Sequence, residues 1–361
     1  MSANRFWAAA ILSALLFGAS TPISKYFLIN THPFALAGFY YLGAALFLLP
    51  LSFGEFRREF LFIRKNRQDF LKLSGAIFFG GMAGPVVLFI GLRISPASSA
   101  ALLLNFEGLW TFVLGWLFFK EHINRKIIFS MLAVLLGGSL LVIEKDMSFN
   151  FGGILIVFAC LFWGLDNNLT ATIEGVSATT NTILKSFFAG ILNLAIYYFF
   201  IAKNQVSVAK GVELFYILLV GGLSYGLSIV LYIRASKFLG AIRSQMIFAL
   251  NPFWGAILSF LVLQEKLSLN FVISSLFMAL ALGLLFFERH IHEHGHHEEE
   301  HEHLHSHDDG HHHHEHIDEK GDKLVDKTTH IHRHNHAALM HSHPHFPDIH
   351  HRHGHGGGRG A

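Results

Sequence analysis

The sequence predicts an all-α membrane protein of about ten transmembrane helices, arranged as two inverted five-helix repeats. Three observations support this fold class. Of the 361 residues, 52% are hydrophobic and only 14% are charged. The apolar residues fall in blocks of roughly twenty, which is the length that crosses about 30 Å of hydrocarbon as a helix. The third observation is an internal repeat at a fixed offset along the chain.

The expected helices follow the apolar blocks in order. The first block, from Phe6 to about Leu28, lacks a small-residue cleavage site after a short core, so it is expected to be a spanning helix and not a cleaved signal. Each block must be helical because lipid offers no partner to backbone donors and acceptors, and each is twice the length of a barrel strand. The other nine helices are expected near residues 33–53, 73–92, 96–119, 127–143, 152–172, 181–201, 214–233, 240–263 and 270–287.

The internal repeat aligns residues 90–144 with the second half of the chain at an offset of 144 positions, without a gap. Trp110 falls on Trp254, and Glu121 falls on Glu265. Five helices per unit is an odd number, so the second unit should be inverted in the membrane. Inverted repeats are frequent in secondary transporters, whose solute site lies near the midplane, although duplication for packing alone is the alternative. The expected domains are residues 1–143, 152–287 and a tail over 288–361.

The orientation follows from the basic residues, because loops rich in Lys and Arg tend to stay in the cytoplasm. Loops on the opposite side hold few of them, such as Lys145 and Lys266. Both termini are therefore expected in the cytoplasm. The loop after the second helix is the most basic, with Arg57, Arg58, Arg64, Lys65, Arg67 and Lys72.

Three segments carry a resemblance to a known family. They are FGASTPISK from Phe17, RISPASSAALLLNFEGLWTFVLGWLFFKE from Arg93, and KFLGAIRSQMIFALNPFWGAILSFLVLQE from Lys237. Together with the duplication, they resemble the drug/metabolite transporter superfamily, specifically its EamA-type ten-helix branch, over roughly residues 6–287. The resemblance implies an alternating-access carrier of the inner cell membrane, commonly an exporter of metabolites, amino acids or toxic compounds.

Glu107 is the strongest candidate for the substrate pathway. An ionisable residue at the centre of a spanning helix costs roughly 2.5–3.5 kcal/mol, so it usually faces a cavity or a partner. Glu107 lies about halfway along the fourth helix, and its repeat partner Asn251 lies about halfway along the ninth. The acid could bind a proton, a cation or a positively charged part of a substrate. The alternative is a hydrogen-bonded glutamate that locks two helices together.

Other polar and aromatic residues extend the candidate pathway. Asp166 on the sixth helix and Lys185 on the seventh lie at similar depths, so an ion pair is feasible, while Asp166 could instead bind solute or protons directly. Aromatic residues in membranes commonly serve packing or interface anchoring, which is the alternative for the ring-bearing candidates. The remaining pathway candidates are Asn167, Trp110, Trp254 and Tyr40.

The spanning region shows no catalytic motif. Its Ser, His and Cys residues form no nucleophile and base pattern, and no GxxxxGK[ST] phosphate-binding loop is present. We therefore expect a gradient-driven process, no enzyme activity and no required cofactor.

The segment after Phe287 has a different composition, with 25 of the 27 histidines between His290 and His355. Because it lacks apolar residues for a core, the tail is predicted to be disordered when unligated. Neutral imidazole is a good ligand for zinc, nickel and cobalt. The tail could buffer or sense metal, feed a transported metal, or only solvate the protein. The candidate metal ligands are His292, His294, His296, His311, His313, His343, His345, His351 and His353.

Three functions remain open from the sequence. The leading hypothesis is a secondary transporter, an exporter of a small metabolite or drug-like solute, with a metal-binding tail. The alternatives are an efflux carrier for divalent metal fed by the tail, and a membrane-anchored metal-binding or sensing protein without transport. The expected partners are a small-molecule substrate, the lipid bilayer, divalent metal ions and, as a homodimer, a second copy of the chain; no nucleic acid is expected.

Overall fold

The structure is a computed structural model of the whole chain. It describes residues 4–119, 125–143, 150–173, 176–202, 209–239, 244, 247–286, 293–296, 299–306, 329–336 and 339–342.

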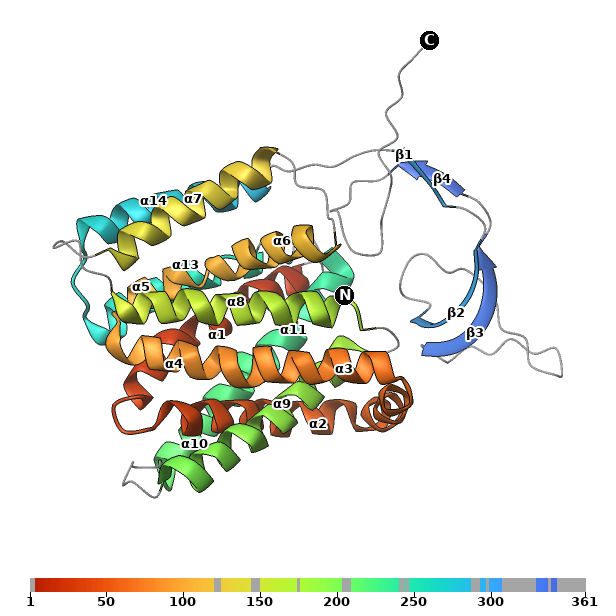
Figure 1. Ribbon diagram of the computed structural model, residues 1–361, viewed down its shortest axis with the longest axis horizontal. Helices are drawn as coiled ribbons and strands as arrows, with labels where there is room; N and C mark the ends of the chain where they lie inside the picture. Colours follow the sequence, from red (N-terminus) through yellow and green to blue (C-terminus); the bar gives the residue numbers. More distant parts are fainter. Residues whose placement is uncertain are drawn as a thin grey trace, which may run out of the picture.

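Ten apolar helical segments run along a common axis in the described part of residues 4–286 (Figure 1). Eight are long and apolar enough to cross a membrane, and two shorter apolar helices complete the ten expected crossings. The first five crossings are α1 (Asn4–Phe27), α2 (Pro33–Lys65), α3–η1–α4 (Arg67–Ala76, Ile77–Ala83, Gly84–Ile94), α5–α6 (Ala97–Leu103, Phe106–Phe119) and α7 (Arg125–Val142). The second five are α8 (Phe151–Ala171), α9–η2 (Ala178–Ile196, Tyr197–Ile201), α10–η4–α11 (Val212–Val220, Gly221–Leu227, Ser228–Leu239), α13 (Asn251–Leu263) and α14 (Leu269–Phe286).

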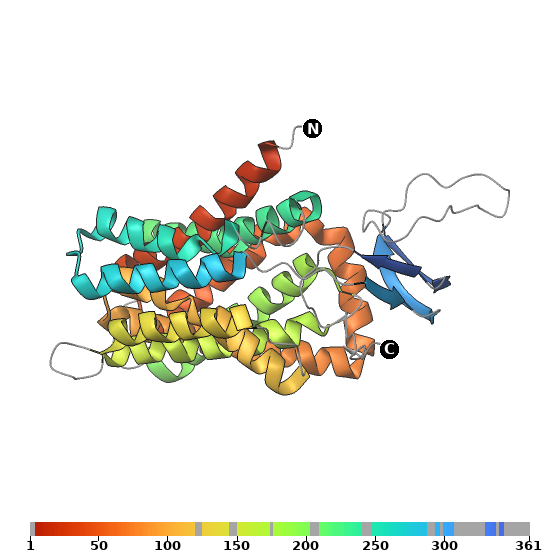
Figure 2. The same cartoon turned by 90° about the horizontal axis from the view of Figure 1, so that it is seen from above.

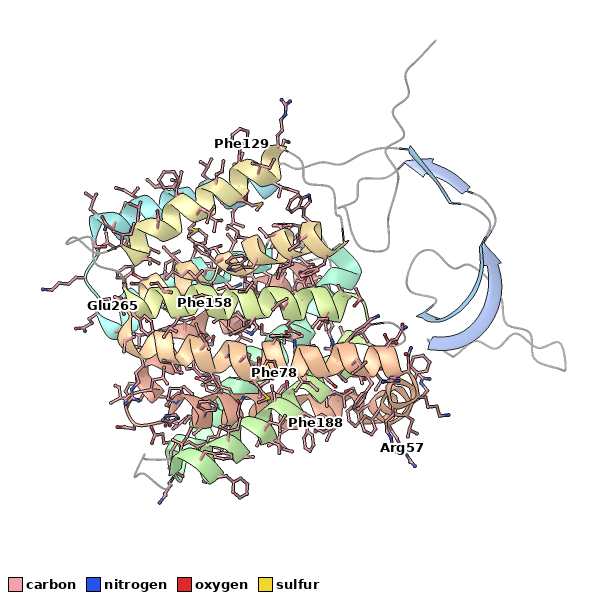
Figure 3. The ribbon with its side chains drawn as sticks, in the orientation of Figure 1. Arg57, Phe78, Phe129, Phe158, Phe188 and Glu265 are labelled. Atoms are coloured by element: carbon pink, nitrogen blue, oxygen red, sulfur yellow. The ribbon has the colours of Figure 1, made fainter. Side chains whose placement is uncertain are left out.

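Large apolar side chains cover the outside of the bundle. Phe78, Phe129 and Phe158 are 52%, 59% and 51% exposed, and they come from three different crossings (Figure 3). In water such a surface would be a large aggregation-prone patch. Facing lipid it is the expected exterior, so the protein is a multi-pass membrane protein.

Hydrogen bonds between α7 and α14 obey the inverted-repeat symmetry. Ser130 and Ser274 are 144 positions apart, and so are Gly137 and Ala281. The Ser130 hydroxyl donates to the Ala281 carbonyl at 3.0 Å, and the Ser274 hydroxyl donates to the Gly137 carbonyl at 2.7 Å. The two bonds exchange under a local two-fold rotation, as the repeat offset predicts.

Two π-helical turns, closer to the N-terminus of each repeat, are related by the same offset of 144 residues. The π-helix η1 begins at Ile77 and η4 begins at Gly221, again 144 positions apart. A π-turn widens the helix and is frequent at functional sites. In η1 the Gly80 carbonyl accepts from the Tyr41 hydroxyl at 2.7 Å and from the Trp163 indole at 3.0 Å. Both π-turns therefore lie at equivalent places in the third and eighth crossings.

The fourth and ninth crossings are broken near their middle, where the sequence predicted continuous helices. In the fourth, α5 ends at Leu103 and α6 begins at Phe106. The Leu103 carbonyl accepts a weak bond from the thiol of the buried Cys160 at 3.5 Å. In the ninth, Pro252 has no N–H for the Phe248 carbonyl, and the Asn251 amide donates to that carbonyl at 2.8 Å. Side chains thus donate hydrogen bonds to the backbone carbonyls that lose their helical partners at the breaks.

The second helix continues past the end that the sequence predicted near Phe53. It bends at Ser52, where φ is −142°, two residues after Pro50, and then runs to Lys65. Figure 2 shows this last part lying across one end of the bundle. The buried Glu59 faces the protein, and its Oε2 accepts from the backbone N–H and hydroxyl of Ser177 at 3.0 and 2.8 Å. The most basic predicted loop is therefore largely helical.

The His-rich tail contains four short strands, where its composition predicted disorder. They are β1 (Glu293–His296), β2 (Glu299–Ser306), β3 (Thr329–His336) and β4 (Leu339–Ser342). Strand β1 pairs antiparallel with β4, and β2 with β3. Alternation of His with Glu along β2 has the two-residue period of a strand, which the compositional argument did not consider.

Candidate functional site

Glu107 lies in the first turn of α6, directly after the break in the fourth crossing. The Asn167 amide on α8 donates to Glu107 Oε1 at 2.9 Å and to the Thr111 hydroxyl at 3.2 Å. Thr111 in turn donates to the Glu107 carbonyl at 2.8 Å. Glu107 and Asn167 are both half-buried and come from different repeats. The carboxyl group therefore lies at the contact between the two halves of the protein.

Asp166 and Lys185 form the ion pair that their depths in the sequence suggested. Lys185 Nζ lies 2.6 Å from Asp166 Oδ2, and the side chains are only 19% and 5% exposed. The Thr170 hydroxyl donates to Asp166 Oδ1 at 3.0 Å. A methyl group on Gly80 would overlap the Asp166 carboxylate, so this glycine makes room for the acid.

The ion pair and Glu107 belong to one electrostatic cluster. Glu107 interacts with both Asp166 and Lys185, as well as with its hydrogen-bond partner Asn167. Two carboxylates with one ammonium leave the cluster one negative charge in excess when both acids are ionised. Such a group suits a proton, a cation or a positively charged part of a solute.

A group of aromatic rings lies beside this cluster. The ring of Tyr225, in η4, lies 5.5 Å from Phe17, 5.6 Å from Tyr40 and 5.7 Å from Tyr41. Tyr225 and Tyr41 both interact electrostatically with Glu107. Tyr40 is fully buried, and its hydroxyl accepts from Ser24 at 3.1 Å. Tyr225 and Phe17 were not among the sequence-predicted site residues.

Asn251 occupies the same place in its repeat as Glu107, but its surroundings differ. It is the first residue of α13, and its amide is bonded to Phe248. A methyl group on Gly18 of α1 would overlap the Asn251 carbonyl, so α13 packs closely on α1. No hydrogen bond joins Glu107 to Asn251 within the residues that the structure describes.

The two repeat-related tryptophans also differ. Trp110 lies one turn after Glu107 on α6, and its buried indole nitrogen has no hydrogen-bond partner in the described part of the chain. Trp254 on α13 is half-buried and approaches Gly18. A buried N–H without a partner calls for an explanation, and an acceptor on a bound solute is one. The part that either tryptophan plays in transport stays a prediction.

The predicted metal ligands lie mostly outside the described residues. Of the nine, only His294 and His296 fall on a described strand, β1; the others are His292, His311, His313, His343, His345, His351 and His353. Over the described ranges, no group of three or more His, Cys, Asp and Glu residues is arranged to hold a metal ion.

Comparison with known proteins agrees with this architecture. The model of the EamA-like transporter family matches residues 6–143 and again residues 150–287. An "uncharacterized transporter" of Methanothermobacter thermautotrophicus is 27% identical over 311 residues, which cover 79% of this chain and 88% of that protein. Another from Clostridium kluyveri is 23% identical, with 68% of this chain and 80% of that protein covered.

A solved crystal structure has a similar fold. It aligns with a TM-score of 0.52 at 14% identity, covering 77% of this chain and 96% of that one. The two family matches correspond to the two repeats related by the symmetric bonds of α7 and α14. The chain therefore belongs to the EamA-like transporter family and is a membrane transporter built from two EamA repeats.

Proposed function

We propose that the chain is a gradient-driven exporter of a small solute, with Glu107 as the group that couples an ion to solute movement. The observation that supports this proposal is the hydrogen bond from Asn167 to Glu107, which joins the two repeats at the break in the fourth crossing. Alternating access moves the repeats of an inverted-repeat carrier against each other around a central site. An ionisable group at that contact can therefore change its surroundings as the repeats move.

The first prediction is that purified protein in proteoliposomes transports at least one solute in response to an imposed gradient. The panel should contain amino acids, other small metabolites, organic cations and the divalent ions of zinc, nickel and cobalt. Flux should depend on a pH or cation gradient, because the acidic cluster can bind either ion. Empty vesicles provide the background. A flux that ignores every imposed ion gradient would contradict coupling, and a flux of metal alone would favour the metal-efflux alternative.

A second prediction concerns location and orientation. The chain should insert in the inner cell membrane with both termini in the cytoplasm, because the most basic segment, residues 57–72, begins with Arg57 at one end of the bundle (Figure 3). Reporter domains fused after Lys65 and at the C-terminus should both report cytoplasm. A reporter inserted after Asn204, between the seventh and eighth crossings, should report the opposite side. A cytoplasmic signal from the Asn204 insertion, or an external signal from either of the other two fusions, would contradict the predicted orientation.

Metal binding by the tail is a second candidate function, and the register of β2 and β3 favours it. The pairing sets His301 opposite His334, His303 opposite His332, and His305 opposite His330. Neutral imidazole is a good ligand for zinc, nickel and cobalt, so histidines at paired positions of two strands are candidate ligands for one ion. These six histidines were not among the ligands that the sequence predicted.

The third prediction tests this tail. The full-length protein should bind zinc, nickel or cobalt at pH 7.5, and a variant truncated after Arg289 should lose most of that binding. Binding should weaken as the pH falls below about 6.5, because protonated imidazole cannot coordinate metal. Basal solute flux should survive truncation, since the described helix α14, which runs to Phe286, lies before the truncation point. Equal metal titrations of the full and truncated proteins would exclude the tail as the binding segment.

A further inference from the structure

The turn between α4 and α5 is held from one side by a lysine of α1. Lys25 Nζ donates to the carbonyls of Leu92, Arg93 and Ser95 at 2.7, 2.9 and 2.8 Å. The last carbonyls of a helix lack partners within the helix, and a cation there is also favoured by the helix dipole. Lys25 therefore caps the C-terminus of α4.

The other side of the same turn is held by an acid from the second repeat. Glu265 Oε1 accepts from the backbone N–H of Ala97 at 2.6 Å. Its Oε2 accepts from the N–H of Ser98 at 3.0 Å and also from the Ser98 hydroxyl. The N-cap position of α5 is Pro96, which provides no side-chain cap. Glu265, in the loop after α13, thus supplies the missing cap from the second repeat.

We call the pair of residues Lys25 and Glu265 the clasp. They attract each other electrostatically, and each neutralises one end of the α4–α5 turn. Gln264 brings Glu265 into place: its left-handed conformation, with φ of 53°, ends α13 and turns the chain back. The clasp therefore ties α1, α4 and α5 of the first repeat to the loop after α13 of the second.

The clasp lies at one end of the bundle. Figure 3 shows Glu265 at the end opposite Arg57, which is the end expected to face outward. Just inside it, a methyl group on Gly255 of α13 would lie 3.1 Å from the Ala101 side chain of α5, so these half-helices from the two repeats are in contact. The two half-helices therefore pack directly against each other at this end of the bundle.

The half-helix that the clasp holds leads directly to the candidate site. Glu107 follows Ser98 by nine residues, or about 13 Å of helix if the chain were continuous. The break between α5 and α6 lies between these two residues. A movement of α5 at the clasp would therefore be transmitted to the turn that positions Glu107.

From these contacts we propose that Lys25 and Glu265 are positioning residues for transport, which hold α5 against α13 and must release it before solute can pass this end of the bundle. The inference rests on the proposed carrier function. Alternating access requires contacts between the repeats at one end to break while those at the other end form. The clasp suits this role because one loop carries its bonds to α5, so they can separate without unpacking a helix.

The clasp can be tested by the accessibility of a cysteine placed behind it. Thr21 is buried on α1, one turn deeper than Lys25, and Cys is close to it in shape. The background should carry Cys160→Ser, which keeps a donor for the Leu103 carbonyl. A membrane-impermeant maleimide is then added to proteoliposomes on the side that the Glu265 end faces. The pH is 7.5, at which the imidazole of His32 is neutral because burial and Arg93 lower its pKa.

Labelling of Thr21→Cys should be about fivefold faster in Glu265→Ala and in Lys25→Ala, the population shift that corresponds to the loss of one helix cap. Glu265→Gln keeps one acceptor and should give an intermediate rate. Glu213→Ala, which removes an acid from the first turn of α10, is the matched control and should leave the rate unchanged. Equal rates in all folded variants would overturn the proposal and leave the clasp a static brace.

The result is separable from the proposed function. Labelling is measured without any solute, so faster labelling together with an absence of flux would show that the clasp keeps this end of the bundle shut and would reject the proposed transport. Flux that persists while the clasp variants label at the parent rate would support the carrier and reject the clasp. If Glu265→Ala does not fold, Glu265→Gln and Lys25→Ala decide the question by the same two outcomes.

Discussion

Replacing Lys185 by methionine should lower the free energy of unfolding by about 3–5 kcal/mol, the usual cost of leaving one partner of a buried ion pair alone. Within the part of the chain that the structure describes, Asp166 would then keep only the Thr170 hydroxyl among its present hydrogen-bonding side chains. The backbone at Gly80 lies against its carboxylate, so a side-chain shift is opposed there. The measurement is denaturant unfolding of the purified protein in detergent.

The double variant Asp166→Asn, Lys185→Met should recover most of the lost stability, because it removes the unpaired charge along with its partner. Lys210→Met, at an exposed position before α10, is the matched control and should change stability by less than about 0.5 kcal/mol. If the double variant is as unstable as the single one, the loss comes from the packing of the Lys185 stem and not from the charge on Asp166.

The symmetry of the fold could be predicted from the sequence because a repeat is a relation between residues and does not depend on helix boundaries. The offset that aligned Trp110 with Trp254 also relates Ser130 to Ser274, and these serines make equivalent bonds. The pairing of Asp166 with Lys185 was predictable for a similar reason. Depth in the membrane follows from the rise per residue, and both residues were counted from the same surface.

The breaks in the fourth and ninth crossings could not be predicted from hydropathy. Leu104 and Asn105 lie within an apolar run, and Pro and Asn occur in continuous membrane helices when neighbours satisfy the freed carbonyls. Here those neighbours include Cys160, which is on another helix. Tyr225 was missed because its role depends on the π-turn η4, although its glycine-rich segment GGLSYGL was a signal of close packing.

Glu107→Gln should abolish ion-coupled accumulation of the solute while leaving the protein folded. Glutamine has the shape of glutamate, and its carbonyl oxygen can still accept from the Asn167 amide. What it lacks is an ionisable proton. If one proton moves per solute, a pH difference of one unit supports about tenfold accumulation, since one unit is worth about 1.4 kcal/mol. The variant should show no accumulation, and downhill flux should persist without a response to pH.

The decisive measurement is the steady-state solute ratio across proteoliposomes at two imposed pH differences, for the parent chain and for Glu107→Gln. Glu107→Asp is the complementary variant, because it keeps the ionisable group and shortens the side chain by one methylene. It should retain coupling at a reduced rate. Thr111→Val serves as a packing control. It removes the second acceptor of the Asn167 amide, the Thr111 hydroxyl, but it removes no charge. Accumulation that survives in Glu107→Gln would show that the carboxyl group only locks α6 to α8. The coupling role would then pass to Asp166, the other acid of the cluster, which Lys185 would have to release before the acid could take up a proton.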